Sequence, residues 1–358
     1  MRKIGFLTSG GDCQALNAAM RGVAKTLYHY YGKDVEIYGI LDGYKGLIYG
    51  NWKKMKPKDF SGILTVGGTI LGTSRQPFKL MNVPDENGLD KVKAMKSNYK
   101  KMDLDCLVIL GGNGTQKTAN LLSQEGLNVV SLPKTIDNDI WATDMTFGFH
   151  SAVEIATSAI DCIHTTAASH GRVFIVEVMG HKVGWLTLYA GIAGGADIIL
   201  IPELPYDPDK ILSALEARNK EGKDFSILAV AEGAISKKDA ALSKKEYKAK
   251  KAKSIYPSVS YEIGAMIEKK LGQEVRITVP GHTQRGGSPC PYDRVLSSRL
   301  GAAAGKLIID KKYGYMSALV NGEIVPVPLA DVAGKLKGVD TNSSIIKEIQ
   351  DMGISLGV

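Results

Sequence analysis

Residues 107–118 read LVILGGNGTQKT. The apolar run 107–110 stops at two glycines, and a polar turn then leads into a stretch that is compatible with a helix. A buried strand followed by a turn and a helix is the repeating unit of an α/β fold with a parallel sheet. The glycines also let the backbone approach another group closely, because they carry no Cβ atom. The stretch therefore indicates both a fold class and a candidate binding turn.

The same unit recurs along the whole chain, where short apolar runs alternate with amphipathic stretches of helical length. The first series of apolar runs is 4–8, 35–41, 107–110 and 129–132, and the second is 173–178, 198–201, 227–231 and 275–279. The length of 358 residues is comfortable for two domains. We therefore predict two side-by-side three-layer α/β domains with mostly parallel sheets.

The chain is expected to cross between the domains twice, at a long helix from about residue 150 and again after residue 279. This predicts one domain from residues 1–148 plus roughly 284–320, and a second from residues 149–283 plus roughly 321–358. In open parallel sheets, ligands bind beyond the carboxyl ends of the strands. The glycine clusters of this chain follow the predicted strands at those ends, so they mark the edges where ligands are expected.

Composition is that of an ordinary globular protein, with 44% hydrophobic and 23% charged residues. No apolar run approaches the roughly 20 residues that span a bilayer. The first residues, MRKIGFLTSGGD, are interpreted as a strand and a glycine turn, so we expect a cytoplasmic protein with no membrane partner. The four cysteines lie far apart without CxxC spacing, which argues against a disulfide framework or a zinc site.

The net charge of +8 is concentrated in the segment 237–253, KKDAALSKKEYKAKKAK. Its eight lysines and two acidic residues contribute +6, which leaves about +2 for the rest of the chain. Only Tyr247 interrupts the run with an aromatic ring, whereas nucleic-acid surfaces interleave several aromatic residues for base stacking. We interpret the segment as a solvated helix-and-loop insertion and expect no nucleic-acid partner.

Two glycine turns occur in the first half of the chain, LTSGGD at 7–12 and LGGNGT at 110–115. Backbone N–H groups at a helix N-terminus, approached through glycines, form a cradle for anions. One such turn can serve chain geometry alone, but two in the same half favour phosphate binding. Neither turn matches the GxxxxGK[ST] nucleotide loop or GxGxxG in full.

A third stretch, PKTIDNDIWATDMTFG at 133–148, places Asp137 and Asp139 just past a strand and close to Lys134 and Thr135. Such a group can position a substrate hydroxyl and a metal-bound phosphate, which are the parts that phosphoryl transfer needs. The alternative is an Asx-type turn, in which the carboxylates only satisfy backbone N–H groups. Arg285, in PGHTQRGGSP, has the planar guanidinium that suits phosphate oxygens.

Together these stretches resemble the 6-phosphofructokinase family of ATP- or pyrophosphate-dependent fructose-6-phosphate kinases, and within it the mixed-substrate subgroup. The similarity covers nearly the whole chain. Its signatures are PKTIDND (133–139), GHTQRGGSP (281–289), GGTILGTSR (67–75), EVMG (177–180) and AEGA (231–234). The resemblance implies phosphoryl transfer from ATP to the 1-hydroxyl of fructose 6-phosphate in glycolysis, with Mg²⁺ and an active site in the cleft between the domains.

The resemblance also implies a role for each matching residue. Asp137 would be the catalytic base, with Thr135 and Asp139 beside it. The donor-binding residues would be Gly11, Arg75, Gly112, Asn113, Gly114 and Thr115, with Asn113 at the metal. The sugar-phosphate residues would be Thr135, Asp137, Arg172, Met179, Gly180, His181, Glu232, Arg276, His282 and Arg285. Arg172 and Arg276 would reach a neighbouring subunit, which implies a homo-oligomer, either a tetramer or a dimer.

The chain departs from the family pattern at several of these positions. Many relatives carry aspartate at Asn113, where an amide can still accept a metal-bound water but lacks the charge. His181 replaces an arginine, and the changed sugar contact leaves another sugar phosphate open as a substrate. Gly114 leaves room for ATP, while Lys134 is common in pyrophosphate users. The alternatives are therefore a pyrophosphate-dependent enzyme or a catalytically weak regulatory or ligand-binding homologue.

Overall fold

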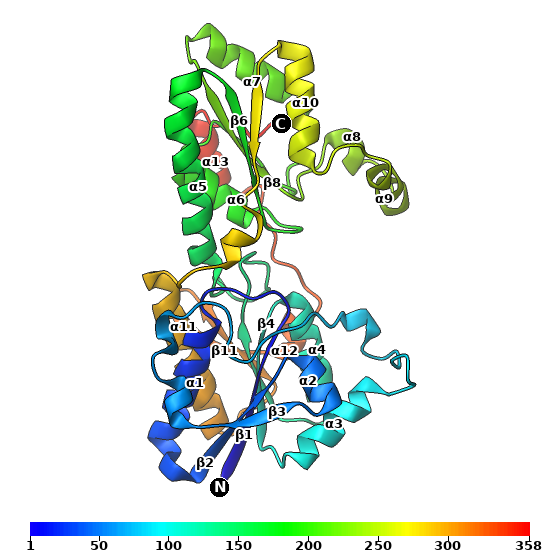
Figure 1. Ribbon diagram of the computed structural model, residues 1–358, viewed down its shortest axis with the longest axis vertical. Helices are drawn as coiled ribbons and strands as arrows, with labels where there is room; N and C mark the ends of the chain where they lie inside the picture. The colour runs from blue at the N-terminus through cyan, green and yellow to red at the C-terminus, as the bar shows by residue number, and fades with distance from the viewer. The chain divides into compact units, whose positions relative to one another are not determined.

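The computed structural model describes residues 1–358, which form two compact units. Unit 1 comprises Met1–Ser151 and Arg285–Lys337, and unit 2 comprises Ala152–Gln284 and Gly338–Val358. Each unit is a sheet covered by helices (Figure 1). The predicted α/β fold with two domains and mostly parallel sheets is confirmed.

Unit 1 is built on a seven-stranded sheet with the order β11-β10-β5-β4-β1-β2-β3. The inner pairs are parallel, and only the two edge strands β3 and β11 run antiparallel to their neighbours. All six residues of β4 are buried, as expected for a strand covered on both faces. The strands are β1 (Arg2–Ser9), β2 (Val35–Ile40), β3 (Trp52–Met55), β4 (Cys106–Gly111), β5 (Val129–Pro133), β10 (Tyr315–Val320) and β11 (Glu323–Pro328).

The helices of unit 1 cover both faces of this sheet, with α1 and α11 on one side and α2, α3, α4 and α12 on the other (Figure 1). Helices α1 and α11 approach closely, because a Cβ atom on Gly301 would lie 2.5 Å from the carbonyl oxygen of Ala19. The helices are α1 (Leu16–Tyr31), α2 (Tyr44–Tyr49), α3 (Lys91–Lys101), α4 (Asn113–Gln124), α11 (Pro291–Ile309) and α12 (Leu329–Val332). Short 3-10 helices occur at Gly32–Asp34, Pro57–Phe60, Ile63–Thr65 and Phe78–Leu80.

Unit 2 is built on a four-stranded parallel sheet with the order β7-β8-β6-β9. One face packs against α7 and α10 in a cluster of buried aliphatic side chains. The strands are β6 (Val173–Val178), β7 (Ile198–Leu200), β8 (Ser226–Ala231) and β9 (Val275–Thr278). The helices are α5 (Phe149–His170), which begins in unit 1, α6 (Trp185–Ala193), α7 (Pro208–Lys220), α8 (Lys237–Ala240), α9 (Lys244–Ala252), α10 (Val259–Leu271), α13 (Ser344–Asp351) and the 3-10 helix Gly281–Arg285, whose last residue belongs to unit 1.

The structure differs from the predicted domain boundaries at the C-terminal end. Residues 321–337, which were assigned to the second domain, lie in unit 1. The reason is that β11 pairs with β10 on the edge of the unit 1 sheet, and that Leu329 and Val332 of α12 are buried in the core of that unit. No local sequence pattern indicates to which sheet such a hairpin is added.

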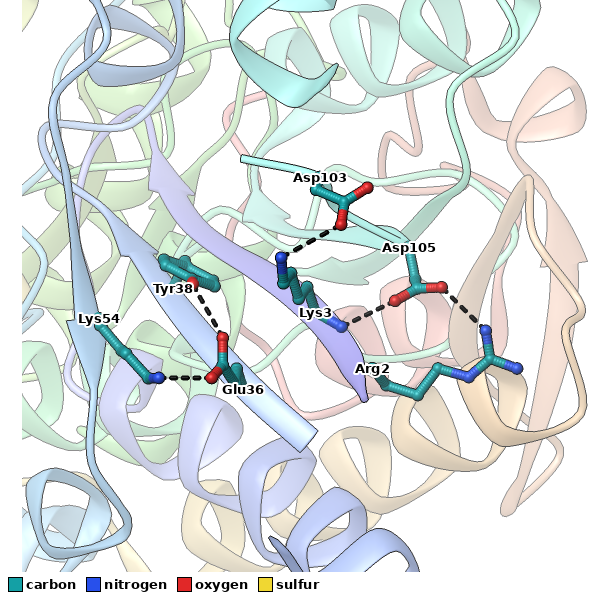
Figure 2. Close-up of polar contacts among 7 residues, drawn as sticks. All are labelled: Arg2, Lys3, Glu36, Tyr38, Lys54, Asp103 and Asp105. Atoms are coloured by element: carbon teal, nitrogen blue, oxygen red, sulfur yellow. Dashed lines mark hydrogen bonds and ion pairs between the residues drawn. The ribbon is translucent and has the colours of Figure 1, made fainter. Parts of the chain in front are cut away.

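Polar contacts fix the amino end of β1 against its neighbours (Figure 2). The Asp105 carboxylate, one residue before β4, accepts hydrogen bonds from the Lys3 backbone N–H at 2.7 Å and from Arg2 Nη1 at 2.8 Å. On the next strand, Glu36 pairs with Lys54 Nζ at 2.5 Å. The Asp105 contacts hold β1 and β4 in register, so that the glycine turns at their carboxyl ends stay side by side.

We predict that replacing Asp105 with alanine lowers the free energy of unfolding by about 1–3 kcal/mol, because it removes the acceptor of a backbone N–H group. Lys54→Ala serves as the control, since this exposed ion pair contributes roughly 0–1 kcal/mol. Urea unfolding of both variants measures the difference. Equal losses in the two variants would contradict a special role for Asp105 in setting the register.

Candidate active site

The carboxyl ends of β1, β4 and β5 bring the predicted donor and base segments of unit 1 together. Ser9 is the register partner of Gly111, and Gly111 is the partner of Pro133. The turn after β1, the turn after β4 and the loop after β5 therefore leave the sheet as neighbours. This is the edge at which open parallel sheets bind ligands.

The turn after β1 is held from two sides. Gly10 donates its N–H to the carbonyl of Ser74 at 3.1 Å and accepts a hydrogen bond from Thr73 Oγ1 at 2.7 Å. A Cβ atom on Gly11 would lie 2.6 Å from Arg285 Nη1. Only a glycine fits at Gly11 while Arg285 keeps this position.

The turn after β4 ends at the N-terminus of α4, which begins at Asn113. Gly112 occupies the N-cap position, and no side chain caps the N–H groups of the first turn. Uncapped N–H groups at a helix N-terminus bind anions. A Cβ atom on Gly114 would meet no heavy atom within 4 Å, so the space in front of this turn is open.

Asn113 has a contact that explains the amide at this position. Its Nδ2 donates a hydrogen bond to the carbonyl oxygen of Lys335 at 2.6 Å. An aspartate could not donate this bond, and its charge would face the carbonyl dipole. The amide therefore anchors the segment after α12 and keeps its Oδ1 as an acceptor.

Thr115 joins the two glycine turns. Its side chain is buried, and its Oγ1 donates a hydrogen bond to the carbonyl of Ser9 at 3.4 Å. Thr115 thus offers its backbone N–H, and not its hydroxyl, to a ligand at the turn.

The loop after β5 carries the predicted base. Thr135 Oγ1 accepts the N–H of Asp137 at 3.0 Å, and Asn138 Oδ1 accepts the N–H of Thr146 at 3.1 Å. Asn138 has a left-handed backbone with φ of 53°, a conformation that asparagine tolerates better than most residues. The side chains of Thr135 and Asn138 thus hold the backbone of this loop at Asp137 and at Thr146.

Burial and the charge of Asp137 raise the pKa of Asp139 to about 6. Both carboxyl groups are half-buried. Because neighbouring like charges make simultaneous ionisation costly, protonation of one carboxylate eases ionisation of the other. The charge of Asp137 therefore makes Asp139 easier to protonate than an isolated carboxyl group.

Lys134 lies beneath the first glycine turn. Its side chain is buried, and its Nζ donates a hydrogen bond to the carbonyl of Gly11. Burial lowers the pKa of Lys134 to about 8, and the nearby Arg285 acts in the same direction. The ammonium group therefore supports the turn that precedes α1.

The two arginines of the unit 1 site differ in their surroundings. Arg75 is exposed on the loop before Gln76. Arg285 Nη1 donates to the carbonyl of Asp12 at 2.9 Å, while its buried Nε has no hydrogen-bond partner. A buried donor without a partner costs free energy, and an anionic ligand would satisfy it.

Sequence analysis missed Lys337, which holds the loop of the predicted base in place. Its Nζ donates to Asn138 Oδ1 at 2.9 Å and to the carbonyls of Thr143 and Asp144, both at 2.8 Å. Its backbone N–H donates to the carbonyl of Asp139 at 3.0 Å. Burial lowers the pKa of Lys337 to about 8. No local signal marks this lysine, because its partners lie almost 200 residues earlier in the chain.

Unit 2 gathers the predicted sugar-contacting residues at the carboxyl ends of β6 and β8. Glu232 Oε1 accepts the N–H groups of Gly180 at 3.3 Å and His181 at 2.8 Å. Met179 donates its N–H to Gln284 Oε1 at 3.2 Å. These contacts fix a turn in which Gly180 has a φ of 144° and His181 has a φ of 53°. Glycine tolerates a positive φ, whereas histidine adopts one at some cost in free energy.

The remaining predicted sugar-phosphate residues of unit 2 lie elsewhere. Arg172 precedes β6 and Arg276 is the second residue of β9, so both are near the amino ends of their strands, and both form ion pairs with Glu274. The structure does not bring them to the Met179–His181 turn. His282 is exposed in the 3-10 helix Gly281–Arg285.

Comparison with known proteins decides the family. The sequence profile described as Phosphofructokinase matches residues 3–308. The chain belongs to the phosphofructokinase family. A relative from Spirochaeta thermophila named ATP-dependent 6-phosphofructokinase is 55% identical over 99% of this chain and 98% of the relative. A second, from Bacteroides thetaiotaomicron and named ATP-dependent 6-phosphofructokinase 3, is 48% identical over 99% and 100% of the two chains.

Solved structures agree with this assignment to the phosphofructokinase family. Pichia pastoris phosphofructokinase in the T-state matches with a TM-score of 0.80 and 33% identity over 92% of this chain, which spans 35% of that longer chain. The pyrophosphate-dependent phosphofructokinase of Nitrosospira multiformis matches with a TM-score of 0.81 over 99% and 92% of the chains, but at 20% identity this likeness shows the fold alone.

The predicted phosphofructokinase family is thus confirmed, whereas its mixed-substrate subgroup stays a prediction. None of the helices is both long and apolar enough to span a membrane.

Proposed function

We propose that this chain is an ATP-dependent 6-phosphofructokinase, which transfers a phosphoryl group from ATP to the 1-hydroxyl of fructose 6-phosphate. The observation that carries the proposal is the full-length similarity to relatives named ATP-dependent 6-phosphofructokinase. The reaction belongs to glycolysis, which would place the protein in the cytoplasm.

Asp137 is the proposed base. Its carboxylate takes the proton of the sugar 1-hydroxyl as that oxygen bonds to the γ-phosphorus of ATP and the bond from this phosphorus to the oxygen of the leaving ADP breaks. Thr135 holds the backbone of Asp137, and Lys337 and Asn138 hold the adjoining loop. Burial and the charge of Asp137 raise the pKa of the neighbouring Asp139 to about 6.

The donor phosphates are proposed to bind at the glycine turns of unit 1, through Gly11 and the residues Gly112, Asn113, Gly114 and Thr115. Uncapped N–H groups at the start of α4 face developing negative charge, and Arg75 is exposed and available to pair with a phosphate. The open space at Gly114 supports ATP over pyrophosphate, because nothing there excludes a larger donor.

Mg²⁺ is the proposed cofactor, and the residues present fit a weakly held ion. The chain has no group of three or more His, Cys, Asp or Glu residues that could hold a metal. Mg²⁺ commonly keeps its waters and binds through substrate phosphates with few protein ligands. Asn113 would contact it through Oδ1, and the ion would neutralise phosphate charge.

The sugar phosphate is proposed to contact Met179, Gly180, His181 and Glu232, together with Thr135 and Asp137. Its 6-phosphate would pair with His282 and Arg285, whose Nε lacks a partner. Arg172 and Arg276 are proposed to act on the site of a neighbouring subunit, which requires a homo-oligomer, a tetramer or a dimer.

Product analysis tests this proposal. The purified protein is incubated with ATP, Mg²⁺ and fructose 6-phosphate, and the position of the new phosphate is determined by NMR. We expect a phosphate on carbon 1 of fructose 6-phosphate and slower reaction with glucose 6-phosphate. Phosphorylation of glucose 6-phosphate in preference to fructose 6-phosphate would contradict the proposed substrate.

The anchoring role of Lys337 leads to a kinetic prediction. Lys337→Met is expected to lower kcat on the order of 100-fold, since small misplacements of a base have effects of this size. The lost positive charge also raises the pKa of Asp139, so the acid limb of the pH profile of kcat moves to higher pH.

Lys335→Met is the matched control, because this lysine is exposed and its contact with Asn113 uses only the backbone carbonyl. It should retain both kcat and the pH profile of the wild type. A Lys337→Met variant with reduced kcat but an unshifted pH profile would contradict the link between Lys337 and Asp139.

A further inference from the structure

The lysine-rich insertion after β8 encloses a cavity in unit 2. Helices α8 and α9 stand beside the first turn of α10 (Figure 1), and the space between them measures about 400 Å³. Small-molecule sites have volumes of about 300–1,000 Å³, so the cavity is large enough for a ligand. Residues of α9, the connection to α10 and the loop after β8 form its walls.

One part of the wall is aromatic and apolar. Tyr247 of α9 and Tyr256 of the connection line the cavity together with Tyr206 and Val259. Ile255, beside them, is 87% exposed. Aromatic side chains that stay partly open to solvent provide a surface on which a flat ring can stack.

Another part of the wall is cationic. Lys250 is paired with Asp239 at 2.5 Å, whereas Lys251 and Lys253 line the cavity without an ion-pair partner. The cavity also reaches Ser258, the N-cap residue of α10. The Ser258 side chain does not cap that helix; its Oγ donates a hydrogen bond to Glu177 Oε2 at 2.5 Å.

The first-turn N–H groups of α10 therefore provide hydrogen-bond donors in addition to the two unpaired lysines, Lys251 and Lys253. Both are donors that bind phosphate oxygens, and the thirteen-residue helix also contributes a positive dipole end. The neighbouring carboxylates are largely occupied: Asp239 by Lys250, and Glu232 by the N–H groups of Gly180 and His181. Glu262 stays available to accept a hydroxyl group.

We propose that this cavity binds a small aromatic phosphate, with its phosphate at Lys251, Lys253 and the start of α10 and its ring against Tyr247 and Tyr256. A nucleoside monophosphate and a pyridoxine-type phosphate share this chemistry. Helix α9 has no buried residue, so packing against the rest of unit 2 contributes little to holding it in place. A ligand in the cavity supplies the missing contacts between α9 and α10.

The cavity also shares Glu232 with the turn that is proposed to contact the sugar. A ligand there would act on the same carboxylate that fixes Gly180 and His181. The affinity for fructose 6-phosphate would then change with occupancy, an effect that rests on the proposed function. Binding itself does not depend on that function, so it is measured without sugar phosphate.

Equilibrium dialysis of the full chain with labelled AMP, without Mg²⁺ or fructose 6-phosphate, tests the site. The variant Lys251→Ala/Lys253→Ala is expected to lose one equivalent of bound AMP, through at least a roughly tenfold loss of affinity, since it removes two charge-assisted hydrogen bonds to the phosphate. Lys244→Ala/Lys245→Ala is the control, because these α9 lysines do not line the cavity. Any AMP bound at the donor turns of unit 1 appears in all three proteins.

Further ligands separate the parts of the proposal. Pyridoxine 5′-phosphate that binds more tightly than AMP identifies a pyridoxine-type ligand, and the reverse order identifies a nucleotide. Adenosine and inorganic phosphate should each bind more weakly than AMP. Phosphate binding as tightly as AMP would overturn the ring contact, and equal AMP binding by the wild type and both variants would overturn the site.

Tyr256→Leu gives an independent check. It should weaken AMP binding while leaving the binding of inorganic phosphate unchanged, and the loss of both would indicate a collapsed cavity. In that case Tyr247→Phe, which keeps the ring, should still bind AMP like the wild type. Failure of that variant as well would overturn the proposed stacking.

Discussion

Replacing Asp137 with serine is expected to lower kcat by about 10²- to 10⁴-fold, which is the usual contribution of general acid–base catalysis. The serine hydroxyl cannot take the proton of the sugar 1-hydroxyl at neutral pH. The KM for fructose 6-phosphate should change little, because the sugar contacts of unit 2 are untouched. Steady-state kinetics with ATP and Mg²⁺ measure both parameters.

Thr135→Ala is the companion variant. It removes the acceptor of the Asp137 N–H group but keeps the carboxylate, so its loss of kcat should be smaller than that of Asp137→Ser. The role of Asp137 as the base also predicts a changed pH profile only in the serine variant. An Asp137→Ser protein with unchanged kcat would exclude Asp137 as the base.

Replacing Gly114 with aspartate is expected to lower kcat/KM for ATP on the order of 100-fold more than kcat/KM for pyrophosphate. This corresponds to about 2.7 kcal/mol of lost transition-state binding. The new carboxylate would occupy the open space before α4 and repel the larger donor. The fold should persist, because a Cβ atom at this position meets no neighbour within 4 Å.

Asn120→Asp controls for the added charge, since it introduces a carboxylate on the same helix and two turns away from the donor site. Both variants are assayed with both donors at fixed Mg²⁺ concentration. Gly114→Asp should alter the ratio of the two kcat/KM values, and Asn120→Asp should not. An unchanged ratio in Gly114→Asp would contradict the steric argument for ATP.

Local patterns predicted most of the fold. The apolar runs at 107–110 and 129–132 became β4 and β5 because buried parallel strands are apolar on both faces. The glycine turns lie at the carboxyl ends of β1 and β4, as the sequence pattern predicted. The sheet to which the β10–β11 hairpin is added was not predicted, since strand pairing across a domain boundary leaves no local signal.

Contacts between distant segments could not be predicted. The sequence suggests a place for Asn113 at the metal, but it does not show that its amide also donates a hydrogen bond to the Lys335 carbonyl. Lys337 was missed because its partners at Asn138, Thr143 and Asp144 are far away in the chain. Such residues look like ordinary surface side chains until the fold brings their partners together.

The lysine-rich insertion illustrates a different limit. The prediction of a solvated helix agrees with α9, which has no buried residue. Helical periodicity predicts which face of α9 is exposed to solvent, but it does not reveal the cavity that the opposite face lines. The cavity against α10 depends on the position of Tyr247 and Tyr256 in three dimensions, so no local pattern indicates it.

The proposed function is tested most directly by the initial rate of fructose 1,6-bisphosphate formation by the wild-type protein, measured in parallel with ATP and with pyrophosphate. The open turn at Gly114, with Lys134 committed to the Gly11 carbonyl, predicts turnover with ATP and little with pyrophosphate. Turnover with pyrophosphate alone, or with neither donor, would contradict the assignment as an ATP-dependent 6-phosphofructokinase.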